Sequence, residues 1–460
     1  MNLVWFRKDL RIVDNPALTT ASKNGPYKAI FISTPQQWHN HDMAPIQVDF
    51  IERHLNLLKN QLNTLGVELV HIEASNFDNQ ISSLLSYVKA NDIENVYANS
   101  EVEFNEQLRD KTIIDLGVSL NLTESDVIVP KGKVLNGSGE MYKVFTPFRN
   151  SWLKYLVANG CSICDYPHLL QQNTSAPQYI HFNANKSCSK KWPLVNVVYD
   201  SIIENFISNK LFSYSEQRDI PSVKGTSGLS PYIAIGAISP KYLLSQVLAH
   251  HPHILDNSAA SEFTWINELA WRDFYKHLLF HFPDLCKSQT FVQKYNDLPW
   301  KNNDVHFKLW CQGNTGYPIV DAAMRQLINT GWMHNRLRMI VASFLTKHLL
   351  IDWRWGERFF MQHLLDGDLS ANNGGWQWAA STGCDAQPYF RIFNPITQSK
   401  KFDPKGEFIR MYVPELKDIP DKEIHFPHEY LSRNGLSKKY VEPVVNHKDA
   451  REEALAFYRV

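Results

Sequence analysis

The stretch LVWFRKDLRIVDNPAL, residues 3–18, decides the fold class of the first part of the chain. Its first four residues form a short apolar and β-prone run, which predicts a strand. The glycine-rich GxGxxG turn that binds dinucleotides does not follow this strand, because the chain continues with RKDLRIVDNPAL instead. We therefore expect an α/β domain without the usual dinucleotide fingerprint.

Three more runs of the same kind follow, at residues 28–32, 67–72 and 95–98. Longer amphipathic stretches lie between them, and in residues 46–65 the apolar positions recur at helical spacing. Strands that alternate with helices predict a parallel sheet flanked by helices. We assign this α/β domain to residues 1–125.

Residues 126–195 have a different texture, because Pro, Gly, Asn and Ser are frequent and hydrophobic periodicity is weak. This composition predicts a long interdomain linker. The linker contains the basic and aromatic segment PKGKVLNGSGEMYKVFTPFRNSWLK, whose one acid is Glu140. Contact with a polyanion and a solvated turn both remain open for this segment.

The chain after residue 195 carries helical signals almost throughout. Helices are predicted over residues 239–250, 261–280, 319–330, 334–350 and 355–365. Ser239, followed by Pro240, has the residue types of a helix N-cap and first turn. The predicted fold is an α/β N-terminal domain with a parallel sheet flanked by helices, a long linker, and a large all-α domain over residues 196–460.

Length and composition limit the class of protein. At 460 residues, of which 44% are apolar, the chain is long enough for two or more globular domains. No apolar run approaches the ~20 residues of a membrane span, and charged residues interrupt the apolar start where a signal peptide would continue. We expect a soluble, cytoplasmic protein that makes no membrane contact.

Charge is unevenly distributed, although the formal net charge is zero. Residues 1–125 carry 10 Lys and Arg against 16 Asp and Glu, a net charge of −6, so the remaining residues carry +6. A polyanionic partner should therefore meet the later part of the chain, although an ordinary solvated surface could produce the same asymmetry.

The cysteines and histidines do not predict a metal site. Cys161 and Cys164 form a CxxC pair, but no second pair follows at zinc-ligand spacing. His277 and His281 lie four apart on a predicted helix without a further ligand pattern, which favours partly buried helix histidines. We expect no metal.

Two segments of the helical region combine glycine, hydroxyl and charged residues. In GTSGLSPYIAIGAISP, Thr226, Ser227 and Ser230 offer hydroxyl and backbone N–H groups of the kind that bind phosphate. In WINELAWRDFYKH, Glu268 and Arg272 share a helix side with two tryptophans. A functional site and an internal Glu–Arg pair are both open for that helix.

Two later segments add arginines, acids and amides. Arg336 and Arg338 lie in an otherwise apolar helix, where they suit phosphate or carboxylate recognition, or lay their stems over apolar neighbours. Asp366 and Asp368 flank Gly367 in a predicted sharp turn, where they can cap a helix or bind a ribose or a heterocycle. Together these features predict a site for an extended nucleotide cofactor.

These segments resemble those of the class I DNA photolyases, within the photolyase/cryptochrome flavoproteins. The similar segments are, in chain order, LVWFRKDLRIVDNPAL, EMYKVFTPF, TSGLS, WINELAWRDFY, TGYPIVDAAMRQL, GWMHNRLRM, DGDLSANNGGWQWAASTG and YFRIFNP. They span nearly the whole chain in the family's order. The resemblance implies a monomeric enzyme whose all-α domain binds FAD.

The resemblance implies a set of FAD-binding residues. They are Tyr214, Thr226, Ser227, Gly228, Leu229, Ser230, Trp265, Arg272, Arg338, Asp366, Gly367, Asp368 and Asn372. Asn372 would face the flavin ring nitrogen that gains a proton on reduction, and Arg338 would pair with Asp366 beside the ring. Such fixed charges and dipoles tune the redox state of a flavin.

The implied substrate is a cyclobutane pyrimidine dimer in double- or single-stranded DNA, flipped out of the helix. The residues implied to form its pocket are Glu268, Trp271, Asn335, Arg336, Met339 and Trp378. Glu268 would accept hydrogen bonds from the base N–H groups, and the tryptophans would stack on the joined bases. Arg218, Arg336 and Arg391 would contact phosphates near the lesion, which gives binding independent of sequence.

The resemblance also implies an electron relay. Trp376, Trp353 and Trp300 match the family's relay tryptophans, which would pass electrons from the surface side at Trp300 to the flavin. Residue pattern alone would place each of them in a core.

An antenna chromophore would bind to the α/β domain. Asn105 and Glu106, in EVEFNEQLRD, match positions that contact 5,10-methenyltetrahydrofolate in relatives. His41, Cys286 and Lys287 would line the same site.

The chain departs from the family pattern at a few positions. Gly228 stands where relatives often have arginine. We expect the loop still to bind the phosphates of FAD but to lack one contact with DNA. Ala270 replaces a larger aliphatic residue, which concerns packing. Cys384 in STGCDAQ is unusual and is expected to be inert.

Three other functions compete with dimer repair. A cryptochrome photosensor of the same fold is the main alternative, but the pocket residues and the absence of a signalling tail near Val460 favour repair. Repair of (6–4) photoproducts relies on a histidine pair, whereas Asn335 follows His334 here. A flavin redox protein without a DNA partner would leave the three phosphate-contact arginines unexplained.

Overall fold

The computed structural model describes residues 1–170 and 177–459. They pack into two compact units. The first unit comprises Met1–Phe212, Ser227–Cys286 and Leu365–Ser370, and the second comprises Ser213–Thr226, Lys287–Leu364 and the chain from Ala371 onward. This division follows packing, so the domains 1–125, 126–195 and 196–460 stay a prediction. Residues 171–176 of the predicted linker lie outside the described residues.

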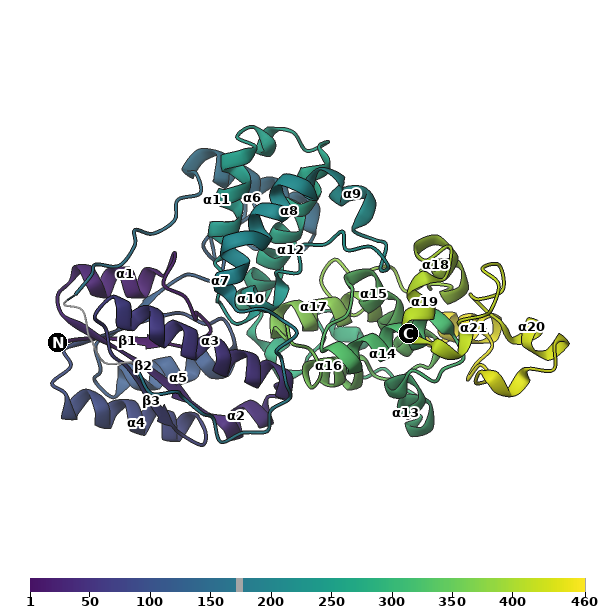
Figure 1. Cartoon of the computed structure of the whole chain (residues 1–460), viewed down its shortest axis with the longest axis horizontal. Helices are drawn as coiled ribbons and strands as arrows, with labels where there is room; N and C mark the ends of the chain where they lie inside the picture. Colours follow the sequence, from purple (N-terminus) through teal and green to yellow (C-terminus); the bar gives the residue numbers. More distant parts are fainter. Residues whose placement is uncertain (171–176, 460) are drawn as a thin grey trace. The chain divides into compact units, whose positions relative to one another are not determined.

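The first unit contains a five-stranded parallel sheet in the order β3-β2-β1-β4-β5. Figure 1 labels three of these strands, β1, β2 and β3. The strands are β1 (Asn2–Phe6), β2 (Tyr27–Ser33), β3 (Leu69–Glu73), β4 (Asn95–Asn99) and β5 (Leu120–Thr123). The predicted parallel sheet is confirmed. The sequence pattern misses β5, because its LNLT sequence is short, half polar and not buried.

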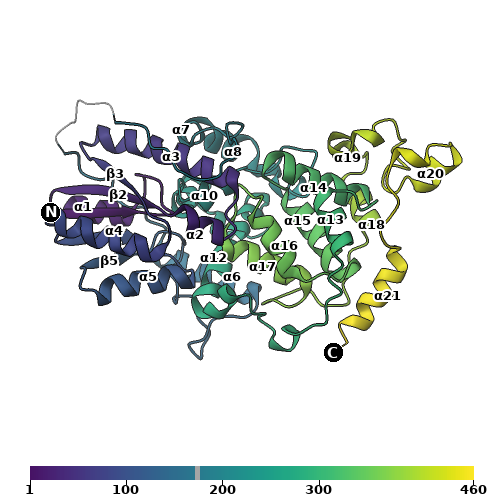
Figure 2. The same cartoon turned by 90° about the horizontal axis from the view of Figure 1, so that it is seen from below.

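Helices cover both faces of this sheet (Figure 2). They are α1 (Pro16–Lys23), α2 (Pro35–Asn40), α3 (Pro45–Thr64), α4 (Phe77–Ala90) and α5 (Phe104–Asp115). All five residues of β1 are buried, and its Leu3 and Trp5 pack with Leu84 of α4 and Ile113 of α5. This apolar packing explains why β1 reads as a continuous apolar run rather than an alternating one.

The same unit contains a group of further helices. They are α6 (Phe145–Asn159), α7 (Val195–Val197), a π-helical turn (Val198–Ile202), α8 (Ile203–Asn209), α10 (Ser230–Ala234), α11 (Pro240–His250), the short turn Ile254–Asp256 and α12 (Ser261–His281). The predicted N-cap is confirmed, because the Ser239 hydroxyl accepts from two amides of α11. The segment predicted as a linker contains α6, a helix that the sequence pattern did not predict, although its Phe148, Trp152 and Leu156 recur at helical spacing and are buried.

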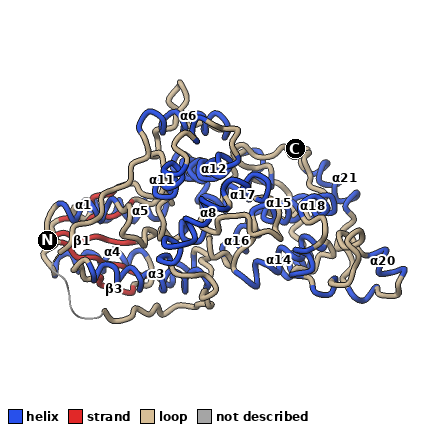
Figure 3. The backbone as a smooth tube through the Cα atoms, turned by 45° about the horizontal axis from the view of Figure 1, so that its top comes forward, coloured by secondary structure: helices blue, strands red, loops and turns tan. Residues whose placement is uncertain are grey.

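The described part of the second unit is helical, and the strands in Figure 3 all belong to the first unit. Its helices are α9 (Tyr214–Gln217), α13 (Asp304–Gln312), α14 (Pro318–Thr330), α15 (Asn335–Ser343), a π-helix (Phe344–His348), α16 (Trp353–Met361), α17 (Leu369–Ala380), α18 (Pro395–Phe402), α19 (Glu407–Tyr412), α20 (His428–Arg433) and α21 (His447–Phe457), with short turns at Gln293–Tyr295, Pro414–Leu416 and Ser437–Lys439. The helix α17 begins in the last residues of the first unit. The predicted helix 334–350 is divided at Ser343, and the predicted helix 355–365 is shifted toward the N-terminus as α16.

Candidate functional site

The turn formed by Asp366, Gly367 and Asp368 is held in place by side chains of the first unit. Ser230 Oγ donates a hydrogen bond to Asp366 Oδ2 at 2.7 Å. Lys276, on α12, donates from Nζ to Asp368 Oδ2 at 2.8 Å. The structure thus brings the predicted acidic turn together with the end of the predicted phosphate loop.

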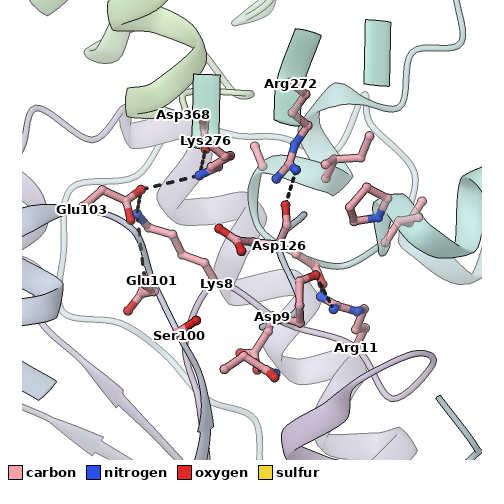
Figure 4. Close-up of a pocket in the computed structure, with 17 residues that line it drawn as sticks. Lys8, Asp9, Arg11, Ser100, Glu101, Glu103, Asp126, Arg272, Lys276 and Asp368 are labelled. Carbon is pink, nitrogen blue, oxygen red and sulfur yellow. Dashed lines mark hydrogen bonds and ion pairs between the residues drawn. The ribbon is translucent and has the colours of Figure 1, made fainter. Parts of the chain in front are cut away.

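Lys276 belongs to a chain of alternating charges that the sequence analysis missed (Figure 4). Its Nζ lies 3.8 Å from Glu103 Oε1, and Lys8 Nζ lies 3.1 Å from the same oxygen. Burial alone would raise the pKa of Asp368, but Lys276 and Arg272 outweigh it and hold the pKa below its usual range. A lysine four residues after an arginine on an apolar helix was the available signal for this network.

The charge chain borders a small polar cavity. Its volume is about 30 Å³, room for roughly one water molecule. Burial raises the pKa of the Glu103 carboxyl, yet Lys8 and Lys276 outweigh this and hold it at about 2. The cavity lies at the carboxyl ends of β1 and β4, where strand order reverses and α/β folds often bind ligands. In this chain, buried ion pairs occupy that position.

Four predicted site residues lie on α12. Trp265 is buried, whereas Glu268, Trp271 and Arg272 are half-buried. The Trp271 ring stacks on Phe145 of α6, with centroids 3.7 Å apart and planes 7° apart. Arg272 donates from its guanidinium to the Asp126 carbonyl oxygen. The orientations of Trp271 and Arg272 are therefore set by protein contacts.

The predicted phosphate loop has the groups that phosphate oxygens need. Thr226 ends one segment of the second unit, and Ser227 begins a segment of the first. Gly228 has a φ of +68°, and no atom lies within 4 Å of the position of a Cβ there. The Leu229 amide donates to Ser227 Oγ at 3.4 Å. Hydroxyl groups beside a left-handed glycine fit the close approach of a phosphate.

The amide of Asn372, on α17, is oriented by its neighbour α16. Asn372 Nδ2 donates to the Glu357 carbonyl oxygen at 2.9 Å, and Asn373 Nδ2 donates to Glu357 Oε1 at 2.9 Å. Burial raises the pKa of Glu357 to about 7, against the opposing hydrogen bond from Asn373. Glu357 is a residue that the sequence analysis missed, because an acid in WRWGERFFM reads as a surface charge.

Two of the three predicted phosphate-contact arginines, Arg336 and Arg218, have protein partners. Arg336 binds Asp219 through both Nη2 and Nε, at 2.9 and 3.2 Å, and its guanidinium lies 4.4 Å from the Phe402 ring centroid. The Arg218 guanidinium lies 5.4 Å from the ring centroid of Tyr214, which is buried. Asp219 was not predicted, because nothing in the sequence pattern links it to α15.

The remaining predicted substrate residues differ in exposure. Asn335 is exposed at the start of α15, and Met339 is half-buried one turn later on the same helix. Arg338 donates from Nε to a backbone carbonyl of the preceding turn at 2.8 Å. Trp378 is half-buried on α17, and Arg391 is exposed. The second unit therefore holds Asn335, Met339 and Trp378 at least partly accessible.

The three predicted relay tryptophans lie in the second unit. Trp353 and Trp376 are buried, and Trp300 is half-buried against Tyr458, with ring centroids 6.0 Å apart. Among the described residues, none hydrogen-bonds to the indole nitrogen of any of the three, whereas Trp310 donates to a backbone carbonyl. The relay role of the three tryptophans stays a prediction.

The predicted antenna residues meet in the first unit. His41 Nδ1 lies 3.9 Å from Glu106 Oε1, and Asn105 Nδ2 lies 3.2 Å from His41 Nε2. Burial raises the pKa of Glu106 to about 7, with Lys8 opposing. Burial also raises the pKa of Cys286 to about 11, and the Glu106 charge adds to it. Lys287, the fifth residue expected here, belongs to the second unit.

The described residues contain neither a metal-site arrangement nor a membrane-spanning helix. No group of three or more His, Cys, Asp or Glu side chains there has the arrangement of a metal site. No described helix is both long enough and apolar enough to cross a membrane. Cys161 and Cys164 are free thiols.

Comparison with known proteins identifies the class to which this fold and these residues belong. The model for the FAD binding domain of DNA photolyase matches residues 265–460, and the DNA photolyase model matches residues 2–165. The chain is 44% identical to the deoxyribodipyrimidine photo-lyase of Escherichia coli strain K12, over 99% of this chain and 98% of that protein.

Solved structures agree with this assignment. A bacterial class III photolyase from Agrobacterium tumefaciens superposes with a TM-score of 0.79 at 33% identity, covering 99% of this chain and 96% of that chain. A Synechocystis cryptochrome superposes with a TM-score of 0.84 at 28% identity, covering 99% of both chains. The chain belongs to the DNA photolyase family, and its helical C-terminal part includes the residues that match the FAD-binding domain of that family.

Proposed function

We propose that this chain is an enzyme that repairs cyclobutane pyrimidine dimers in DNA by a light-driven split of the cyclobutane ring. The observation that carries the proposal is the 44% identity to a deoxyribodipyrimidine photo-lyase along 99% of the chain. When bound, reduced and photoexcited FAD would lend one electron to the dimer and take it back after the ring has split, so the reaction has no net redox change. The residues of this chain bind the lesion, hold the cofactor and exclude competing reactions.

We assign the lesion to residues of α12, α15 and α17. They are Glu268, Trp271, Asn335, Arg336, Met339 and Trp378. The Glu268 carboxylate accepts hydrogen bonds from the base N–H groups, and the two tryptophans stack on the bases. The flat contact of Trp271 with Phe145 supports this role, because a ring already fixed in orientation loses little entropy when it stacks.

We assign FAD to the loop 226–230, the turn 366–368, and the side chains of Tyr214, Trp265, Arg272, Arg338 and Asn372. The hydroxyls of Thr226 and Ser227 donate to the cofactor's phosphates, whereas the Ser230 hydroxyl donates to Asp366 and holds the acidic turn. Asn372 presents its amide to the flavin ring in one orientation, because the Glu357 carbonyl fixes it. Fixed dipoles of this kind tune a flavin without reorganisation at the moment of reaction.

Trp376, Trp353 and Trp300 are proposed to carry electrons that reduce oxidised flavin under light. Support comes from their location in one packed unit, from buried Trp376 to half-buried Trp300. The test is flavin photoreduction in single Trp→Phe variants.

The antenna is proposed to be 5,10-methenyltetrahydrofolate, bound by His41, Asn105 and Glu106. The convergence of these three polar side chains supports a polar heterocycle as the ligand. An absorption spectrum of the purified protein separates a folate band from a deazaflavin band.

DNA is proposed to be held by its phosphates through Arg218, Arg336 and Arg391, which makes binding sensitive to salt. We propose that the protein acts on DNA as a monomer in the cytoplasm. Light scattering of the purified protein tests the monomeric state.

The decisive experiment compares illuminated and dark samples of the reduced protein with thymine-dimer DNA. Repair restores the absorbance of the thymine monomers in the light only. A cryptochrome, the alternative raised by the Synechocystis neighbour, would bind FAD but show no recovery above the dark control. Equal absorbance in light and dark would overturn the proposal.

A further inference from the structure

One ammonium group in the first unit links the acidic turn to the helix that carries the antenna residues. Lys276 Nζ donates to Asp368 at 2.8 Å and lies 3.8 Å from Glu103. Asp368 closes the turn that precedes α17, and Glu103 immediately precedes α5, which begins with Phe104 and contains Asn105 and Glu106. Figure 4 shows Lys276 between the two carboxylates.

We propose that Lys276 is a positioning residue for FAD, which holds the Asp366–Asp368 turn in the arrangement that the cofactor requires. This inference rests on the proposed FAD site. Lys276 does not need to touch the cofactor, because it acts through Asp368.

Burial makes this contact specific. The side chains of Lys276, Glu103 and Asp368 are 5, 7 and 14% exposed, so solvent screens their charges little. A buried ammonium needs carboxylate partners, and a buried carboxylate left without its ammonium is strongly disfavoured. The turn therefore has a strong preference for the one position that keeps Asp368 against Lys276.

The position of the turn affects the cofactor residues on both sides of it. Asp366 is bound by Ser230 of the predicted phosphate loop at 2.7 Å. Asp368 also accepts from the Ser370 hydroxyl in the first turn of α17, the helix that contains Asn372. A shift of Asp368 is thus transmitted to the start of α17 and to the phosphate loop.

The alternative role of Lys276 is structural, as one more buried ion pair of the first unit. Lys186 provides a matched control, because its Nζ binds the buried carboxylate of Glu52 at 2.6 Å in the same unit. Removing either lysine leaves a buried carboxylate without that partner. Only Lys276 contacts the acidic turn, and it is also the more buried of the two, at 5% exposure against 25% for Lys186.

The experiment compares the holoenzyme with Lys276→Met, Lys276→Arg and Lys186→Met variants. FAD dissociation is measured from the fluorescence of released flavin, and the flavin midpoint potential is measured by spectroelectrochemistry. We expect Lys276→Met to weaken FAD binding by about tenfold or more, as expected for the loss of a charged hydrogen bond, and to shift the potential. Lys276→Arg should restore both values, and Lys186→Met should leave both unchanged.

Several results would overturn the inference. They are wild-type FAD affinity and potential in Lys276→Met, or equal weakening in Lys186→Met. If Lys276→Met does not fold, Lys276→Gln provides the test, because its amide can still donate to Asp368 and should give an intermediate affinity. An affinity of Lys276→Gln equal to that of wild type would then contradict the proposal. Failure of the wild-type protein to bind FAD would instead refute the proposed function.

Discussion

Replacing Gly356 with alanine should displace Trp376, the residue assigned to the flavin end of the electron path. A Cβ at position 356 would lie 2.1 Å from Cη2 of Trp376, whereas ordinary contact begins at 3.4 Å. The indole must therefore move by about 1.3 Å. Trp376 is 2% exposed, and the rings of Trp310 and Phe360 lie 6.0 and 4.9 Å from it, centroid to centroid. Overpacking of this kind costs about 1–3 kcal/mol.

Gly375→Ala is the matched control, because Gly375 lies on α17 next to Trp376 and no atom lies within 4 Å of the position of its Cβ. Alanine in a helix interior is more stable than glycine by about 0.5–1 kcal/mol. The assay is urea unfolding of both variants without cofactor, followed by the rate of flavin photoreduction in the holoenzymes. We expect Gly356→Ala to lose stability and photoreduction rate, and Gly375→Ala to lose neither.

Two outcomes would refute the reasoning. An unchanged urea midpoint in Gly356→Ala would show that Trp376 is not packed against residue 356. A lower midpoint with a normal photoreduction rate would show that the position of Trp376 is unimportant for electron transfer. Weak FAD binding in Gly375→Ala would show that the cofactor approaches the backbone at that glycine.

Three further predictions concern single side chains. The indole nitrogen of Trp376 has no hydrogen-bond partner among the described residues, so the Trp376→Phe variant should fold. This variant should reduce its flavin more slowly under light but repair dimers normally once it is pre-reduced. Loss of both activities would mean that Trp376 has a structural role. The slope of log affinity for lesion DNA against log salt concentration should become shallower by about 1 in Arg336→Ala. Asp219→Asn should bind DNA more tightly, because the Asp219 carboxylate competes with phosphate for Arg336. An unchanged slope and unchanged affinities would show that Arg336 does not contact phosphate. Burial lowers the pKa of Lys347 from 10.5 to about 7, so the folded state releases a proton that the unfolded state keeps, and stability should rise with pH between those values relative to Lys347→Met. The Lys347 ammonium lies 3.6 Å from the Tyr458 ring centroid, and this contact stabilises the charged lysine, which offsets part of the pH dependence. The free energy of unfolding should then rise by roughly 3 kcal/mol across that pH range. Urea midpoints of the two proteins that change in parallel across the range would contradict the prediction.

Local pattern was enough to predict the parallel sheet and most helix positions. The strand β1 and the helix α12 are long or apolar enough for their periodicity to be clear. Pattern failed at β5, which is short and not buried, and at α6, where glycine and proline in the surrounding segment masked four buried apolar residues. The break at Ser343 depends on the packing of a buried π-helix, which periodicity does not report.

The residues proposed to contact ligands could be predicted from the sequence, because the family resemblance extends over whole motifs. The protein partners of these residues could not be predicted. Lys276 and Glu103 are 173 positions apart in the chain, and Arg336 and Asp219 are 117 apart, so only the folded chain shows that they meet. Glu357 likewise acts through contacts with a neighbouring helix rather than through any local pattern.

The central claim is that light absorbed with FAD bound to this chain drives the repair of pyrimidine dimers. The most direct test strips the protein of flavin, restores FAD to half of the sample, reduces it, and illuminates both halves with thymine-dimer DNA. We predict that thymine-monomer absorbance returns only in the illuminated sample that contains FAD. Equal recovery without FAD, or no recovery with it, would contradict the claim.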